Sequence, residues 1–303
     1  MFSRLLNLIK NPNFNTTYIF ARFKLVRSLS KYIKYFLKIF SKKNLHMGPI
    51  QKKNLILLRN KPIASALSYV EINKGINDIL SQLKSNGLYE GFYLKKNVLN
   101  NLLLLSNNCI LTHRGNKKSF KNLEEVNIFN QNNKNPCTIV DLINDKAEEI
   151  SELDILIDEI ARDKNLLSIA DNYLGKVSKI YTRFTWSTVC DSDSKWRENE
   201  QTVYFHYDVH DFGFVYVFFY LSDCNQLSGA HEVILGSHNK KKMSHLIGPA
   251  KSDEKKLKTY YSKNSFKIIE GTSGHGFVED TSAFHKAHAP IKKPRLALQI
   301  RYH

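Results

Sequence analysis

Residues 205–212 have the sequence Phe-His-Tyr-Asp-Val-His-Asp-Phe, in which apolar or aromatic side chains alternate with polar ones as far as His210. This alternation predicts an extended strand over residues 203–210. Alternate residues of a strand face the same side, so the side chains of His206 and Asp208 are expected to point toward one spot. Two different ligand groups directed at one point are the beginning of a metal site.

A second segment with histidines, residues 284–290, begins about 76 residues after Asp208. It contains His285 and His288, and Arg295 follows inside an apolar run that again predicts a strand. Two histidines and one carboxylate leave part of a coordination sphere open. That arrangement suits non-haem Fe(II) and oxygen chemistry.

Length and composition indicate a globular protein with one large core or two modest ones. The chain has 303 residues, of which 42% are apolar and 12% aromatic. Its four cysteines have no paired short spacing, so the sequence predicts neither a disulfide scaffold nor a thiolate zinc site. A reducing, cytoplasmic location is expected.

The net charge of +17 is concentrated at the amino-terminal end. The first 70 residues carry fourteen Lys or Arg and no Asp or Glu, so the remaining residues have a net charge of only +3. No nucleic-acid motif accompanies the charge, and no nucleic-acid partner is expected.

Residues 1–60 are predicted to form a basic amphipathic helical segment. Between Tyr18 and Phe40, Lys and Arg recur at spacings of three and four with apolar residues on the other side. Such a helix can make peripheral contact with an anionic membrane, here through residues 18–43, placing the protein at the membrane surface. The charges interrupt every apolar run, so the helix cannot span a bilayer. The alternatives are a helix packed on the protein's own core and a cleavable transit peptide.

The rest of the chain, residues 61–303, is expected to form one domain with a helical part, 61–175, and a β-rich part, 176–303. Helices are predicted at 76–86, ended by Gly87, at 148–161, and at 166–174, ended by Gly175. An extended run is expected at 88–94, and the Asn-rich residues 127–135 are expected to form a loop.

After Lys176, short β-branched and aromatic runs predict many strands, which is typical of a sandwich or barrel. The predicted strands are 180–189, 203–210, 214–221, 232–235, 266–270, 275–278 and 296–302. Residues 239–263 contain eight lysines and are expected to form a solvated loop. A further hypothesis is that this loop caps the site and draws in an anionic substrate through Lys240, Lys241 and Lys242.

The order of motifs in the carboxy-terminal half resembles the phytanoyl-CoA dioxygenase family of Fe(II)/2-oxoglutarate oxygenases. The resemblance covers residues 70–303 and is densest from 166 onward. The motifs that carry it are, in order, Tyr173-Leu174-Gly175, His206-Tyr207-Asp208, Leu221-Ser222-Asp223, Gly229, Leu235-Gly236-Ser237-His238, Glu279-Asp280-Thr281, His285 and Arg295. The resemblance implies a double-stranded β-helix, a jelly roll whose two sheets form a funnel.

The resemblance also implies a site and a reaction. His206, Asp208 and His285 would be the ligands of Fe(II), and Arg295 would hold the far carboxylate of the cosubstrate 2-oxoglutarate. With O₂, the enzyme would hydroxylate a small-molecule, lipid-linked or glycan-linked metabolite and release succinate and CO₂. Halogenating relatives replace the carboxylate ligand with a small residue, so Asp208 favours hydroxylation. No motif indicates which substrate is used.

Several residues and functions remain as alternatives. His288 competes with His285, but the family spacing to the arginine favours His285. His210 and His231 could bind metal or support the ligands, His238 belongs to a tight turn, and Arg301 could replace Arg295. Gln201, Tyr204 and Trp186 are candidates to line the pocket or to belong to the core. A cupin-like isomerase or sensor and an inactive jelly-roll adaptor are the competing classes of function.

Overall fold

The structure of the chain is a computed structural model that describes residues 55–56, 67–114, 118–133, 139–143, 150–189, 202–210 and 213–303. The basic helix expected within residues 18–43 lies outside the described residues, and so does Gln201. Among the helices that are described, none is both long and apolar enough to cross a membrane.

Local capping residues determine where several helices begin and end. The helices are α5 (Ile76–Asn86), α6 (Lys96–Ser106), α7 (Leu123–Asn132), α8 (Glu152–Ala161), α9 (Lys164–Leu174), α11 (Met243–Ile247) and α12 (Glu254–Tyr260). The predicted end of α5 at Gly87 is confirmed, and this glycine has a left-handed φ of 78°. The helix expected at 148–161 begins later, because Ser151 forms a capping box with Asp154.

The strands form two antiparallel sheets. They are β1 (Leu55–Ile56), β2 (Val70–Ile72), β3 (Leu88–Leu94), β4 (Ile110–His113), β5 (Ser119–Phe120), β6 (Ile139–Ile143), β7 (Ile180–Ser187), β8 (Val215–Tyr220), β9 (His231–Ile234), β10 (Phe266–Ile269), β11 (His275–Glu279), β12 (His285–Ala287) and β13 (Arg295–Tyr302). The major sheet has the order β2-β3-β11-β8-β13-β7-β6-β4-β5, with β1 paired to β7, and the minor sheet has the order β10-β9-β12.

The strand order confirms the predicted jelly roll. The core has eight extended segments, which in chain order are β7, the bridged residue His206, β8, β9, β10, β11, β12 and β13. The first, third, sixth and eighth, which are β7, β8, β11 and β13, lie in the major sheet. The second, fourth, fifth and seventh, which are His206, β9, β10 and β12, lie together in the minor sheet. This alternation between two facing sheets is the double-stranded β-helix. Region 61–175 adds α5 to α9 and also β2 to β6, which extend the major sheet at both edges.

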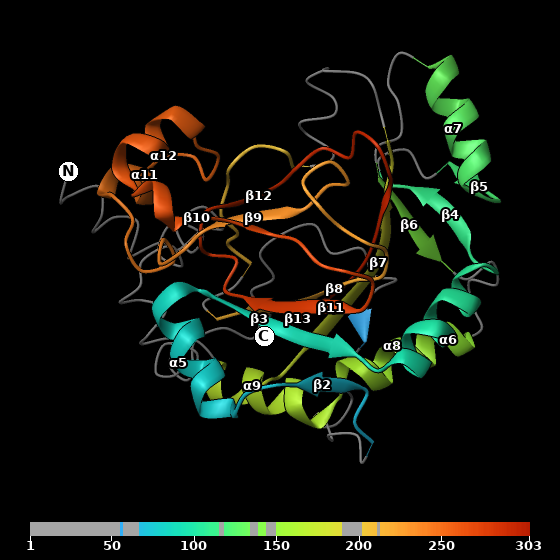
Figure 1. Cartoon of the computed structure of the whole chain (residues 1–303), viewed down its shortest axis with the longest axis horizontal. Helices are drawn as coiled ribbons and strands as arrows, with labels where there is room; N and C mark the ends of the chain where they lie inside the picture. The colour runs from blue at the N-terminus through green and yellow to red at the C-terminus, as the bar shows by residue number, and fades with distance from the viewer. Residues whose placement is uncertain are drawn as a thin grey trace, which may run out of the picture.

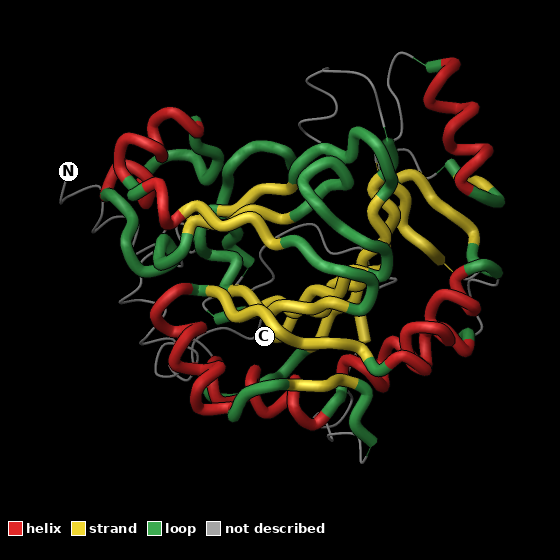
Figure 2. The backbone as a smooth tube through the Cα atoms, in the orientation of Figure 1, coloured by secondary structure: helices red, strands yellow, loops and turns green. Residues whose placement is uncertain are grey.

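Four helices, α5, α6, α8 and α9, cover the outer side of the major sheet, and the minor sheet faces its other side. Figures 1 and 2 show α5, α9, α8 and α6 running along the outer side of the major sheet, while β9, β10 and β12 form the facing layer. The largest apolar cluster joins these helices to the sheet through residues such as Val217, Phe219, Leu298 and Ile300. The inner face of the major sheet is therefore the one turned toward the site.

The expected strand over residues 203–210 is wrong in detail. Only His206 forms a bridge, to His285, and the neighbouring backbone bonds to other partners: Asp208 N–H donates to Thr281 O and Phe205 O accepts from Ser252 N–H. The segment stays extended, but it has no single partner strand, so a continuous ladder does not form.

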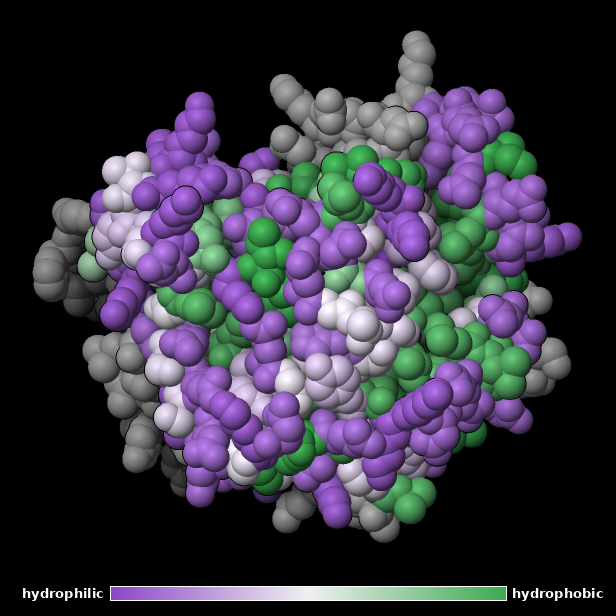
Figure 3. Space-filling model, viewed as in Figure 1, coloured by the Kyte–Doolittle hydropathy of each residue, from purple (hydrophilic) through white to green (hydrophobic). Residues whose placement is uncertain are grey.

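The two loop predictions also need correction. The Asn-rich stretch 127–135 is largely helix α7, because Asn122 caps it by accepting from Glu125 N–H and Val126 is fully buried on it. The Lys-rich stretch 239–263 contains α11 and α12, since Asp253 caps α12 and its Leu257 is fully buried. Figure 3 shows hydrophilic side chains over the α11–α12 corner, which agrees with its lysine content.

Candidate metal centre

The first two candidate ligands point away from an apolar cluster. Phe205, Tyr207 and Val209 pack together with Phe284 and α12, so the side chains of the intervening His206 and Asp208 face the opposite side. The extended backbone thus places both groups on one side without a full strand. The sequence-based expectation that they converge agrees with the structure.

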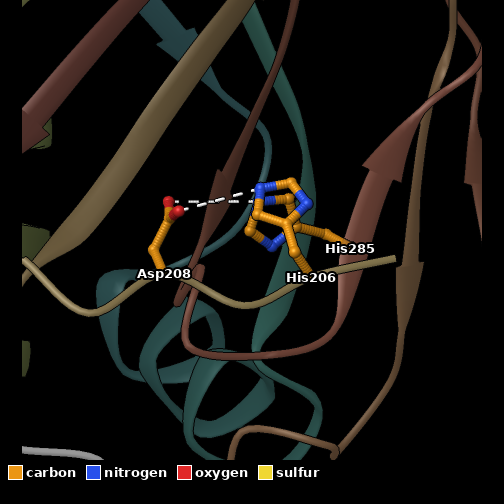
Figure 4. Close-up of side chains that lie close together, drawn as sticks. All are labelled: His206, Asp208 and His285. Atoms are coloured by element: carbon orange, nitrogen blue, oxygen red, sulfur yellow. Dashed lines mark ion pairs between the residues drawn. The ribbon is translucent and has the colours of Figure 1, made fainter. Parts of the chain in front are cut away.

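His285 joins them from the first position of β12. The backbones of His206 and His285 exchange two hydrogen bonds, at 2.9 and 2.8 Å, which hold the two segments in register. The imidazole centroids are 4.3 Å apart. Asp208 Oδ1 lies 3.8 Å from His206 Nε2 and Asp208 Oδ2 lies 3.9 Å from His285 Nε2. Figure 4 shows the carboxylate directed toward both rings.

The geometry of the three groups fits a divalent metal ion. One ligand atom from each of His206, Asp208 and His285 lies within 4.8 Å of the others. His206 Nδ1 lies 3.1 Å from Tyr204 O, and His285 Nδ1 lies 3.0 Å from Ala283 O. These contacts make each Nδ1 the donor, which leaves both Nε2 atoms as unprotonated acceptors facing the carboxylate.

The electrostatics favour the protonation states that a metal requires. Burial lowers the pKa of His285 to about 4, with the charge of His206 acting in the same direction, so His285 is neutral at pH 7. Burial acts to raise the pKa of Asp208, but His210, His285 and His206 outweigh it and hold this pKa well below its usual range. Neutral imidazoles and an ionised carboxylate are the forms that bind metal.

His210 is a third histidine whose ring contacts the Asp208 carboxylate. Its Nε2 lies 3.3 Å from Asp208 Oδ2 and 3.0 Å from the hydroxyl of Tyr216. The ring of Tyr216 comes from β8, and its hydroxyl also accepts from Arg301 Nη1 at 3.2 Å. His210 therefore belongs to a chain of polar contacts that ends at the Asp208 carboxylate, in the supporting role expected of an extra histidine.

His231 and Glu279 form a buried pair beside His285. Glu279 is fully buried on β11, and its Oε2 lies 2.7 Å from His231 Nε2. The His231 ring stacks on that of His285 with a centroid distance of 5.2 Å. Burial raises the pKa of Glu279 to about 8 and lowers that of His231 to about 3, so burial drives both groups toward their neutral forms.

Arg295 is a buried cation at the start of β13. Its Nη1 donates to Gly229 O and its Nη2 donates to Ser187 Oγ at 3.2 Å. Its Nε is buried and has no hydrogen-bond partner among the described residues. In the described part of the chain, no carboxylate forms an ion pair with Arg295, so the guanidinium has hydrogen bonds but no counter-charge.

Solved structures with similar folds were found at low identity. AviO1 from Streptomyces viridochromogenes Tue57 is 10% identical, with 77% of this chain and 96% of AviO1 covered and a TM-score of 0.46. The epimerase SnoN, in complex with Fe3+, alpha ketoglutarate and nogalamycin RO, is 10% identical, with 75% and 82% covered and a TM-score of 0.47. HygX from Streptomyces hygroscopicus, with nickel, 2-oxoglutarate and hygromycin B bound, is 12% identical, with 75% and 86% covered and a TM-score of 0.47.

No protein-family model matches the sequence, and no curated protein matches it either. Because the three TM-scores are below 0.5, the assignment of the site rests on its side chains alone.

Other residues singled out in the sequence lie elsewhere. His288 Nε2 lies 2.9 Å from Glu232 Oε2, on the face of the minor sheet turned away from His285. His238 contacts Lys84 O, as a turn residue would. The interpretation of Trp186 as a pocket residue is wrong, because it packs against the helix-covered side of the major sheet.

Two residues close to the ligands were not recognised in the sequence as parts of the site. Glu279 appeared only within a family motif, and Tyr216 only within a predicted strand. The one available indication for Glu279 was a carboxylate in an otherwise apolar strand. For Tyr216 there was none, because an aromatic residue in a strand usually belongs to the core.

Proposed function

We propose that the protein is an Fe(II)- and 2-oxoglutarate-dependent oxygenase of the phytanoyl-CoA dioxygenase type, formed by residues 61–303. The observation that carries the proposal is the convergence of His206, Asp208 and His285, with both Nε2 atoms and the carboxylate directed at one point. A centre with two histidines and one carboxylate is typical of non-haem Fe(II) oxygenases.

A buried cation that has no counter-charge in the described part of the chain supports the choice of cosubstrate. Arg295 is 9% exposed and has no carboxylate partner among the described residues. A buried charge without a counter-charge costs free energy, and an anionic ligand would recover it. The far carboxylate of 2-oxoglutarate has the charge and planar shape that a guanidinium binds.

The residues of the chain have distinct tasks in this proposal. His206, Asp208 and His285 hold the metal, and the carbonyls of Tyr204 and Ala283 fix the orientation of the two imidazoles. Bound Fe(II) with 2-oxoglutarate and O₂ supplies the oxidising power for hydroxylation of a C–H bond, with succinate and CO₂ as co-products. Arg295 orients the cosubstrate, and the buried surroundings of His285 exclude water.

Anaerobic titration tests the proposal. Fe(II) followed by 2-oxoglutarate should produce the visible charge-transfer band of the complex, and His206→Ala should abolish it. His288→Ala is the matched control, because His288 pairs with Glu232 away from the site, and it should keep the band. Arg295→Gln should raise the 2-oxoglutarate concentration for half-saturation about tenfold or more. Absence of the band in the wild type, or its persistence in His206→Ala, contradicts the assignment.

A further inference from the structure

One part of the inner face of the major sheet is open to solvent next to the candidate metal centre. Directly opposed residues of antiparallel strands share a face. Arg301 is opposite Tyr181 and Tyr216, and Gln299 is opposite Arg183 and Phe218. We call these six residues, all partly exposed, the arginine patch. Toward the Arg295 end of the same face, Ala297 and Ser187 are buried.

The arginine patch lies on the side of the sheet that faces the metal ligands. Phe218 packs against His231 with a centroid distance of 5.3 Å. Arg301 Nη1 donates to the Tyr216 hydroxyl, which contacts His210 Nε2, and that same nitrogen contacts Asp208. Three consecutive polar contacts thus connect the Arg301 guanidinium to a candidate metal ligand.

Positive charge exceeds negative charge in the patch. Within the described part of the chain, Arg301 has no carboxylate partner. Asp141 Oδ1 lies 3.8 Å from Arg183 Nε and 3.3 Å from Arg114 Nη2, so two guanidiniums share one carboxylate. The negative charge of Asp208 does not offset this excess, because it would neutralise part of the positive charge of a bound metal ion.

The guanidinium of Arg301 is held in place by two tyrosines, Tyr181 and Tyr216. Its central carbon lies 4.5 Å from the centroid of the Tyr181 ring, and Tyr216 receives Nη1. Nε is buried without a hydrogen-bond partner, and within the described residues no bond is donated by Nη2. Nε and Nη2 form the edge through which arginine binds an oxyanion bidentately.

We propose that Arg301 and Arg183 bind an oxyanion group of the substrate, a carboxylate or a phosphate, and thereby orient the substrate beside the metal. This role rests on the proposed oxygenase function, because the metal supplies the reaction. It deepens that function by giving the substrate a chemical class. It also separates the two arginines of β13: Arg295 serves the cosubstrate and Arg301 the substrate.

Calorimetric titration of the full-length, metal-free protein with inorganic phosphate, and separately with sodium acetate, tests the anion site. At least one anion should bind, and Arg301→Gln and Arg183→Gln should each weaken its affinity about tenfold. Lys240→Gln, which removes an exposed positive charge that has no partner among the described residues, is the control and should change the affinity less than about twofold. Arg301→Lys keeps the charge but loses the planar fork, so it should bind with intermediate affinity.

The outcomes separate this proposal from the oxygenase assignment. Equal affinity in the wild type, Arg301→Gln and Arg183→Gln overturns the anion site, as does an equal loss of affinity in Lys240→Gln. Arg183 is the safeguard against misfolding, because its side chain is 37% exposed and its replacement leaves the core intact. The anion titration needs no metal, so the two proposals can fail separately. Absence of the Fe(II)–2-oxoglutarate band would contradict the oxygenase assignment, whereas anion binding that depends on Arg301 would still support the anion site.

Discussion

At the scale of single residues, Asp163 shows how one side chain connects distant parts of the fold. Its Oδ1 accepts from Asn165 N–H at 2.8 Å and Leu166 N–H at 3.3 Å, which caps α9. Its Oδ2 accepts from Tyr69 N–H at 2.7 Å and Val70 N–H at 3.2 Å, just before and within β2. The carboxylate is fully buried, and its hydrogen bonds from Tyr69, Val70 and Leu166 are buried as well, so these three N–H groups depend on Asp163 as their acceptor.

Asp163→Ala should therefore lower the free energy of unfolding by about 3 to 5 kcal/mol, from the lost cap and the unsatisfied N–H groups. Asp158→Ala is the control, because its ion pair with Arg162 is partly exposed and should contribute less than about 1 kcal/mol. Urea unfolding of both variants measures the difference. Similar losses in the two variants would show that the buried cap contributes nothing beyond a surface ion pair.

The candidate ligands illustrate a limit at the same scale. Residue type alone does not separate His285 from His288, since each follows Asp208 at a plausible spacing, and only the family spacing to Arg295 favours His285. The structure separates them because successive residues of β12 alternate between faces, so His285 faces the site and Lys286 faces Glu232. His288, past the end of the strand, joins Lys286 in contacting Glu232.

At the scale of elements, side-chain contacts connect the segment that contains α11 and α12 to the chain on both sides of His285. Lys241 Nζ donates to Ser237 O at 3.0 Å and to Ser282 O, and it lies 4.7 Å from the centroid of the Tyr207 ring. Lys286 Nζ adds an ion pair with Glu254 of α12 at 2.7 Å. The Lys241 ammonium thus donates to two backbone carbonyls, which argues against the hypothesis that Lys241 attracts an anionic substrate.

Lys241→Met should lower the free energy of unfolding by about 2 kcal/mol, because the buried Ser282 carbonyl loses its donor. Lys240→Met is the matched control: Lys240 is exposed, and its ammonium has no partner within the described residues. It should change the unfolding free energy by less than about 0.5 kcal/mol. Denaturant unfolding compares the two, and equal effects would mean that the contacts of Lys241 do not fasten this segment.

At the scale of the whole molecule, the candidate centre joins chain segments far apart in sequence. His206 and Asp208 lie on the segment before β8, and His285 lies on β12. An unfolded chain would not keep these groups together, so a metal bound by all three binds the folded state alone. By mass action such binding stabilises the fold.

Addition of Mn(II), at about one hundred times its dissociation constant, to protein treated with a chelator should stabilise the fold by about 2.7 kcal/mol. For a chain of this size, the midpoint of thermal unfolding should rise by roughly 5 °C. His285→Ala should lose the shift and His288→Ala should keep it. A rise of equal size in His285→Ala would place the metal elsewhere on the protein.

The extent of sequence-based prediction differs between the fold and the site. Alternating and helical patterns were enough to predict most strands of the core, α5, α8 and α9, because these patterns record which side of an element is buried. They failed where tertiary contacts outweighed composition, as in α7, where burial of Val126 and a capping asparagine override the Asn-rich composition. The strand at 203–210 failed because its backbone finds several different partners.

The sequence by itself determined the inventory of the site: His206 and Asp208 on one side of an extended segment, a later histidine, and arginines on the last strand. Only the tertiary structure showed how His285 reaches the other two ligands, that Arg295 is buried with no counter-charge among the described residues, and that Arg301 stands beside Tyr181 and Tyr216. The physical reason is that periodicity specifies the face of a residue, whereas strand register specifies its neighbours.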